Sequence, residues 1–382
     1  MRQAREMPIS GSTSGQARRV VIRSVGTAAA GVVGALRQAL PFSEERLAAC
    51  IYQAPAELLG HLDQTTAEAL ARALMTMGLE VETLGPSETF TPGGPDYDVA
   101  LAIQGTDRLL DAAREIATFL GVSFMQARQI LCACPTDLIG KVSANTVAAI
   151  RRRFEPLGVA VDVSRREGAV FDLFVGDCPP PQQAQVQRCL REAGLLTGDA
   201  GEAGDAPRPR VLAGLREPEA KACYERLKGC GAPIRIVNRD FQRFDVRLEE
   251  ARDTPAMVEL LVESTGMPEA VARKVPARTP IVIHHNLSYR ETQEALARIA
   301  GLGGWASAHL LALQNVRLQL AKVGDPDSTS RLLEVLGGIE PERAREMVRV
   351  RGVLDHPATV PQARWLQHEL RRVGTDARMV VA

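Results

Sequence analysis

One pattern recurs five times along the chain and constrains the fold more than any other feature. Each copy has a short apolar segment, an amphipathic helix, a glycine and a strand with alternating hydrophobicity. The pentapeptide EALAR occurs in two of these helices, at 68–72 and 294–298, and we interpret the two copies as occupying the same position of a repeated unit. The glycines expected to end the five helices are Gly78, Gly158, Gly231, Gly304 and Gly374.

Cap residues precede four of these helices. The side-chain oxygens of Asp63, Ser143, Ser288 and Thr359 are expected to accept hydrogen bonds from backbone amides of the first helical turn. Ser288 and Glu291 have the spacing of a capping box. The caps and the glycines together predict where each helix begins and ends.

Each of these patterns is preceded by a second recurring pattern, which forms the first half of the repeated unit. The apolar strands VVIRSV, YDVALAI, FDLFV, FDVRL and NVRLQL are each followed by a helix-periodic segment, and in four copies by a second one. The chain is therefore predicted to be an α+β protein. It would consist of five tandem β-α-α-β-α-β units of roughly 70 residues, each a small three-stranded sheet covered by helices.

The predicted organisation has short junctions and one degenerate unit. In unit three the second helix is expected to be replaced by a flexible loop, 197–210, because LTGDAGEAGDAPRPR has no helical periodicity. The predicted segments are a disordered tail at 1–17, unit one at 18–84, a linker at 85–96, unit two at 97–164, unit three at 169–238, unit four at 243–311 and unit five at 314–382.

Composition excludes several classes of protein. Lys+Arg and Asp+Glu each number 46 and aromatic residues make up 4%, so the basic surface and stacking side chains of nucleic-acid-binding proteins are missing. No apolar stretch approaches the roughly 18 residues of a membrane span. The N-terminal residues contain no apolar segment typical of a secretory signal. We expect a cytoplasmic protein that binds neither nucleic acid nor membranes.

Motifs for catalysis or cofactor binding are also missing from the sequence. It contains no GxGxxG or GxxxxGK[ST] phosphate loop, no HExxH and no GxSxG in a folded segment. The seven cysteines include no CxxC pair, although Cys132 with Cys134, and the four cysteines from Cys178 to Cys230, leave metal binding open as an alternative. We predict no catalytic residue, no cofactor and no metal.

Three units carry residues that are typical of one known family. These are YDVALAI, LGVSFMQARQILCACP and GVAVDV in unit two, FDVRL and STGMPEAVARKV in unit four, and GGIEPERAREMV in unit five. With them, the unit resembles the C-terminal domain of the acidic stalk protein of the bacterial large ribosomal subunit, which recruits translation GTPases. The resemblance extends from Arg18 to Ala382, and the Clp-protease adaptor has a related fold. The Ala-Arg pairs at 127–128, 272–273 and 344–345 fall where the stalk family has an Ala-Lys pair.

The resemblance implies a partner-binding face formed by the first helix and the start of the second. The family's basic residues carry over incompletely: its first-helix lysine corresponds to Gly34, Arg114, Gln187, Glu259 and Arg331. The lysine that opens the family's second helix is replaced in every unit that has this helix. The residues predicted to form the face are Arg37, Arg114, Arg128, Glu259, Arg273, Arg331 and Arg345.

These features predict a non-catalytic interaction or scaffold protein with one or more protein partners. The five faces differ in charge, so they would bind different partners or each other. The alternative is a ribosome-associated protein that recruits translation GTPases. A third reading is a set of domains attached to an enzyme whose catalytic chain lies elsewhere.

Overall fold

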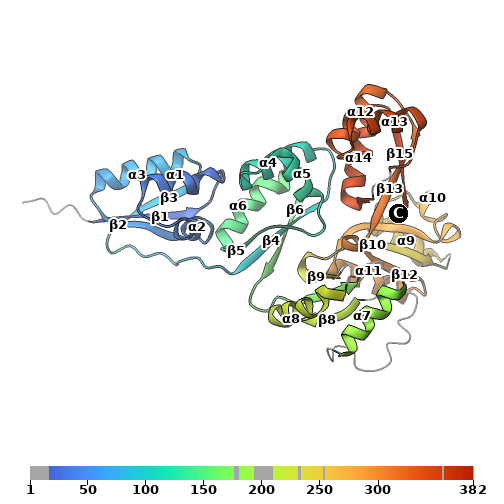
Figure 1. Ribbon diagram of the computed structural model, residues 1–382. Coiled ribbons are helices and arrows are strands. Elements are labelled where there is room, and N and C mark those ends of the chain that lie inside the picture. Colours follow the sequence, from blue (N-terminus) through green and yellow to red (C-terminus); the bar gives the residue numbers. More distant parts are fainter. Residues whose placement is uncertain are drawn as a thin grey trace, which may run out of the picture. The chain divides into compact units, whose positions relative to one another are not determined.

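The computed structural model describes residues 17–175, 180–192, 210–230, 234–252, 254–354 and 357–381. Within these residues it contains five separate three-stranded sheets, and the first strand of each repeat lies between the other two. Helices accompany every sheet, as Figure 1 shows in chain order from blue to red. The prediction of an α+β protein with five repeated units is confirmed.

Repeats one and two contain all the predicted elements in the predicted order. Repeat one consists of β1 (Arg18–Ser24), α1 (Gly31–Ala39), α2 (Glu44–Tyr52), β2 (Ala56–Leu62), α3 (Gln64–Thr76) and β3 (Glu80–Leu84). Repeat two consists of β4 (Tyr97–Ile103), α4 (Leu109–Leu120), α5 (Phe124–Cys132), β5 (Thr136–Val142), α6 (Ala144–Phe154) and β6 (Val159–Arg165).

Repeats four and five follow the same order, with a shortened second helix in repeat four. There α10 ends after one turn and a 3-10 turn follows at Pro276–Arg278, because proline has no N–H to continue the helical ladder. Repeat four consists of β10 (Arg243–Glu250), α9 (Pro255–Thr265), α10 (Glu269–Ala272), β11 (Ile281–Ser288), α11 (Tyr289–Gly301) and β12 (Trp305–Leu310). Repeat five consists of β13 (Asn315–Lys322), α12 (Pro326–Val335), α13 (Pro341–Val350), β14 (Ala358–Thr359), α14 (Val360–Arg372) and β15 (Asp376–Val381).

Repeat three is described only in part. The predicted loop 197–210 and the predicted tail 1–17 lie outside the described residues, apart from Ala17 and Arg210. Arg210 begins a strand instead of ending a loop. The described elements are β7 (Phe171–Val175), α7 (Pro180–Glu192), β8 (Arg210–Leu215), α8 (Glu217–Leu227) and β9 (Ile234–Asn238).

The predicted helix starts are confirmed. Asp63 accepts from the amide of Thr66 at 2.9 Å, and Thr359 accepts from that of Gln362 at 3.3 Å. Ser288 forms the expected capping box with Glu291. These bonds satisfy amides of the first turn that have no partner within the helix.

Three of the five predicted glycines end their helices as expected, and one prediction is wrong. Gly78, Gly158 and Gly374 have positive φ values of 93°, 76° and 77°. In repeat four the left-handed residue is Gly303, with φ of 73°, and not Gly304. Gly231 lies outside the described residues.

The same one-residue offset separates the two EALAR segments. Glu68 lies five positions after the cap residue Asp63, whereas Glu294 lies six positions after Ser288. Aligned on the caps, the fully buried Ala67 and Leu74 of α3 correspond to Thr292 and Ile299 of α11. The interpretation that the pentapeptides share one position is therefore wrong, because burial and capping set the register of the helix.

A left-handed residue in the second strand is a shared feature that the sequence did not indicate. His61, Lys141 and Asn286 have φ values of 58°, 60° and 59°, and Gly214 has 79°. Each lies two residues before the residue that precedes its third helix. In repeats one, three and four the pairing register shifts there, so the residue belongs to a β-bulge that bends the strand toward the helix.

The chain divides into two compact units. One ends at Pro95 and includes Lys141–Ala149, and the other contains Asp96–Gly140 and Ile150–Ala382. The boundary between Pro95 and Asp96 falls within the predicted linker 85–96, which forms neither helix nor strand. The second unit therefore contains nearly all of repeat two together with repeats three, four and five.

The first part of the predicted linker is held against repeat one. Arg19 donates hydrogen bonds to the carbonyl oxygens of Gly85 and Glu88. Gly93 donates its amide to the carbonyl oxygen of Pro55 at 2.8 Å. This segment is therefore part of the fold of repeat one and not a free spacer.

The described helices include none that is both long and apolar enough to cross a membrane.

Candidate interaction surface and the junction of the repeats

Six of the seven predicted partner-binding residues lie on the surface. The ion pairs found at these residues join neighbours in the chain: Arg37 lies 3.3 Å from Glu44, and Arg114 lies 3.1 Å from Asp111. Exposed ion pairs of this kind contribute roughly 0–1 kcal/mol, so they do not prevent binding to a partner. The exposed residues are Arg37 on α1, Arg114 on α4, Glu259 on α9, Arg273 directly after α10, Arg331 on α12 and Arg345 on α13.

Arg128 on α5 differs from the other six because it is buried. Only 5% of the residue is exposed, and its Nη1 donates to the carbonyl oxygen of Val335 at 2.6 Å. Val335 is the last residue of α12 in repeat five. Burial lowers the pKa of the Arg128 guanidinium, and the nearby Cys132 opposes this shift. One predicted face residue of repeat two is thus engaged by another repeat.

Two further contacts join repeats two and five. The hydroxyl of Thr359 donates to the carbonyl oxygen of Cys132 at 2.7 Å. Nε2 of His368 lies 3.5 Å from Oδ1 of Asp107. Together with Arg128, they connect α5 and the segment before α4 in repeat two to the end of α12 and to α14 with its cap residue in repeat five.

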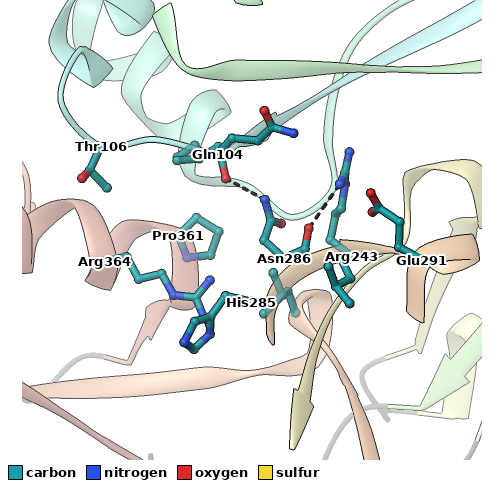
Figure 2. Close-up of a pocket in the computed structure, with 11 residues that line it drawn as sticks. Gln104, Thr106, Arg243, His285, Asn286, Glu291, Pro361 and Arg364 are labelled. Carbon is teal, nitrogen blue, oxygen red and sulfur yellow. Dashed lines mark hydrogen bonds between the residues drawn. The ribbon is translucent and has the colours of Figure 1, made fainter. Parts of the chain in front are cut away.

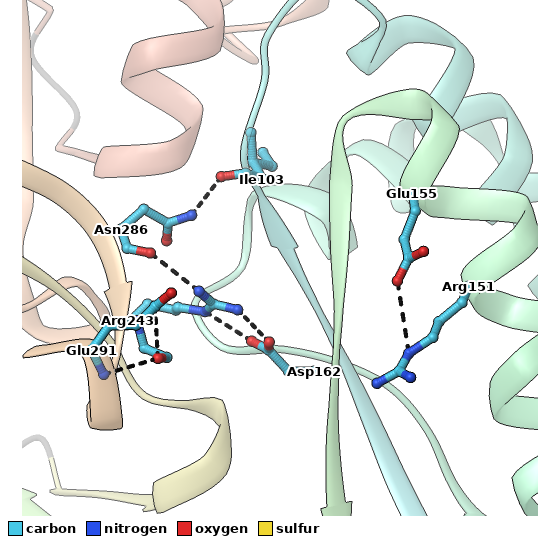
Figure 3. A network of polar contacts seen from close by, with 8 residues as sticks. Ile103, Arg151, Glu155, Asp162, Arg243, Asn286 and Glu291 are labelled. Atoms are coloured by element: carbon cyan, nitrogen blue, oxygen red, sulfur yellow. Dashed lines mark hydrogen bonds and ion pairs between the residues drawn. The ribbon is translucent and has the colours of Figure 1, made fainter. Parts of the chain in front are cut away.

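An ion pair and an amide join repeats two and four (Figure 3). Arg243 on β10 binds the carboxylate of Asp162 on β6 through two nitrogens, with Nε at 2.9 Å from Oδ2. Its Nη1 donates to the carbonyl oxygen of Asn286 at 3.2 Å. Asn286 in turn donates its Nδ2 to the carbonyl oxygen of Ile103 at 2.7 Å. A planar guanidinium with several donors suits this bidentate arrangement better than an ammonium would.

Asp245 holds repeat five to repeat four. Its carboxylate accepts from Nη2 of Arg364 on α14 at 2.5 Å and lies 3.3 Å from Nδ1 of His285. Burial alone would raise the pKa of Asp245. The hydrogen bond from His285 and the charge of Arg364 outweigh burial and hold the pKa below its usual value.

Asp245 is one of three equivalent aspartates. Asp98, Asp172 and Asp245 each follow an aromatic residue in the first strand of their repeat, and each binds an arginine. In repeats two and three the arginine directly follows the third strand of the same repeat, as Arg166 and Arg239. In repeat four it comes from repeat five. The repeated YD and FD dipeptides were the signal in the sequence, but they do not indicate which arginine binds.

A cavity of about 310 Å³ lies where repeats two, four and five meet. Figure 2 shows Thr106, Pro361, Arg364, His285 and Asn286 around this opening. Arg364 and His285 both contact the carboxylate of Asp245, and the lining combines charged, polar and apolar residues. The cavity is therefore part of the junction between these three repeats.

An apolar cluster joins repeats three and four. Phe174 and Val237 from repeat three pack with Phe244 and Leu310 from repeat four and with Leu313 from the turn after it, and Cys134 of repeat two borders the cluster. Burying side chains of this size contributes about 1.5–3 kcal/mol each. Repeats two to five are thus joined by apolar as well as ionic contacts.

The sequence left metal binding open at Cys132 with Cys134 and at the four cysteines from Cys178 to Cys230. In the part of the chain that the structure describes, no group of three His, Cys, Asp or Glu residues could hold a metal ion. Burial raises the pKa of Cys132 and of Cys134 to about 12. Cys178 lies outside the described residues.

The chain matches no protein-family model, and searches of curated proteins and of solved structures also found no match. The resemblance to the ribosomal stalk domain therefore stays a prediction made from the residues.

Proposed function

We propose that this protein is a non-catalytic, cytoplasmic scaffold that binds protein partners through the faces formed by the first and second helices of its repeats. Repeats two to five hold several of these faces in one block. The exposed residues Arg114, Arg273, Arg331 and Arg345 belong to this block, and Arg37 belongs to the face of repeat one.

The observation that carries this proposal is the contact of Arg128. In repeat two, a residue of the predicted face binds the end of a helix that comes from another repeat. The face can therefore recognise a folded protein surface, with the interface buried and the arginine desolvated. Arginine is enriched among residues that dominate protein–protein interfaces, because its guanidinium donates several hydrogen bonds and its stem packs against apolar surface.

The proposal is tested by comparing two sets of charge reversals in the tagged full-length chain. The face variant carries Arg114→Glu, Arg273→Glu and Arg345→Glu. The control variant carries Arg151→Glu, Arg290→Glu and Arg371→Glu, exposed residues on the third helices of the same three repeats. Proteins captured from the host extract are quantified by mass spectrometry.

We expect a set of proteins that the wild type and the control variant capture equally. The face variant should recover them at least roughly fivefold less, the effect of losing about 1 kcal/mol of binding free energy. Equal recovery by the two variants would contradict the proposal. Translation GTPases or ribosomal proteins in the lost set would favour the ribosomal alternative.

A further inference from the structure

The end of α12 is capped in an unusual way, by a residue of another repeat. A helix leaves its last carbonyl groups without partners inside the helix. Here the amides of Leu336, Gly338 and Ile339 bond to the carbonyl oxygens of Leu332, Glu334 and Leu333. The side-chain amide of Gln362 donates to the carbonyl oxygen of Leu336 at 3.1 Å. The carbonyl of Val335 is left, and it accepts its hydrogen bond from Arg128.

The guanidinium of Arg128 is suited to this position by charge and by space. The carbonyl end of a helix carries a partial negative charge, which attracts a cation. Gly338 takes the left-handed conformation after the helix, with φ of 69°. A Cβ at this position would lie 3.3 Å from Nη2 of Arg128, so the glycine leaves room for the guanidinium. None of the described acidic side chains pairs with Arg128, and the helix end takes that role.

The equivalent arginines of repeats four and five are free of such a contact. The alanines before them, Ala272 and Ala344, are fully buried like Ala127 before Arg128, so the three helices have the same rotation. Nevertheless Arg273 and Arg345 are exposed and bond only within their own helices, to Glu269 and to the carbonyl oxygen of Pro341. Of these three faces, the one in repeat two is covered.

We propose that repeat five is a built-in ligand of the repeat-two face, with the carbonyl end of α12 seated on Arg128. One consequence of this inference rests on the proposed function: a partner that binds the repeat-two face must displace repeat five and must itself offer the carbonyl end of a helix. The contact between repeats two and five is tested on the protein without any partner. The contact can therefore be refuted without refuting the proposed function, and the reverse.

The test measures how often repeat five leaves, through alkylation of Cys132 in the full-length chain. Cys132 is buried at the end of α5, where its carbonyl oxygen accepts from Thr359 of repeat five. Alkylation by iodoacetamide at each cysteine is quantified by mass spectrometry. Cys50 in repeat one and Cys223 in repeat three report on the rest of the chain.

In Arg128→Gln we expect alkylation of Cys132 to become roughly tenfold to a hundredfold faster, since a charge-assisted hydrogen bond is lost. Removing this cation also removes an influence that lowers the pKa of the Cys132 thiol, so faster labelling cannot be an electrostatic effect. Arg128→Lys should restore part of the protection. Arg345→Gln, the same change at the exposed equivalent, should leave the rate unchanged.

A second variant perturbs the contact from the side of repeat five. In Gly338→Asn, the new residue tolerates the left-handed conformation but places a side chain where the guanidinium of Arg128 lies. Like Arg128→Gln, it should accelerate the labelling of Cys132 and leave the labelling of Cys50 and Cys223 unchanged. The proposal is overturned if neither Arg128→Gln nor Gly338→Asn changes the Cys132 rate. It is equally overturned if Cys223 accelerates to the same extent, since that would mean loss of the whole block.

Discussion

The central strands of repeats two and five are both buried on one face, but the burial of their other face differs. Val99 and Leu101 of β4 and Leu318 and Leu320 of β13 are buried in both repeats. Between them lie Ala100 in repeat two, which is 1% exposed, and Gln319 in repeat five, which is exposed. The same small fold thus buries its central strand on two faces in one copy and on one face in the other.

The second face of the repeat-two sheet is built for close approach. Ala100 and Ala102 pair with Asp162 and Ala160 of β6, so small side chains dominate this face. Ser164, next along β6, is fully buried and donates to Asp240 of the turn between repeats three and four, at 2.7 Å. In repeat five the corresponding surface carries Arg317 and Gln319 and remains exposed. A strand without polar alternation therefore marks the copy whose sheet is covered on both sides.

The largest effect should come from a charge placed on the covered face. Ala100→Glu puts a carboxylate at a fully packed position opposite Asp162, and we expect it to lower the free energy of unfolding of the block by about 4 kcal/mol. Gln319→Glu, the matched change in repeat five, should alter it by no more than about 0.5 kcal/mol. Urea unfolding followed through Trp305 and Trp365 measures both. Equal losses would refute the difference between the two faces.

The ion pair that closes this face should rank second. Arg243→Gln leaves the carboxylate of Asp162 without its partner, and we expect a loss of about 3 kcal/mol. Arg317→Gln removes an exposed arginine from the open face of repeat five and serves as the control. In the double variant Arg243→Gln, Asp162→Asn the loss should shrink, because no unpaired charge remains. A double variant as unstable as the single one would show that the arginine acts through packing alone.

A smaller and pH-dependent effect is expected at Asp245, which ties repeat five to repeat four. Its pKa is depressed in the folded protein, so its contribution is present above the unfolded value near 4 and is lost as pH falls through the lower folded value. Asp245→Asn should lower stability by about 2 kcal/mol at pH 7, and the difference from the wild type should disappear as pH falls through the lowered pKa of the folded state. Asp376→Asn, at an exposed position on β15, is the control. A difference independent of pH would mean that ionisation of Asp245 contributes nothing.

The sequence predicted the repeated unit because its signals are local. Caps such as Ser288 and left-handed glycines such as Gly78 act within one helix turn, and they are visible in a few neighbouring residues. The alignment of the two EALAR segments was wrong by one position because sequence identity over five residues does not determine the rotation of a helix. The burial of Thr292 and Ile299 determines it.

The junction could not be predicted in the same way. Asp162 and Arg243, or Arg128 and Val335, are far apart in the chain, and their pairing depends on how whole repeats dock. The pattern of β4 does contain part of this information, because YDVALAI lacks the polar alternation of an exposed sheet face, unlike β13. It indicates that a second face is covered and leaves open what covers it.

The last expectation is the absence of an effect, and it concerns the first helices of the same two repeats. Arg114 on α4 and Arg331 on α12 are both exposed, and they are the basic residues that the resemblance predicts at the position of the stalk family's first-helix lysine. Recruitment of a GTPase by an electropositive helix face depends on several cations acting together, and such attraction weakens with salt. Here Arg128, the other predicted face residue of repeat two, is buried against repeat five. We therefore expect that the purified protein will not stimulate factor-dependent GTP hydrolysis on ribosomes stripped of their stalk. Stimulation that is lost in Arg114→Glu, Arg331→Glu but kept in Arg151→Glu, Arg371→Glu would instead support the ribosomal function and contradict the scaffold.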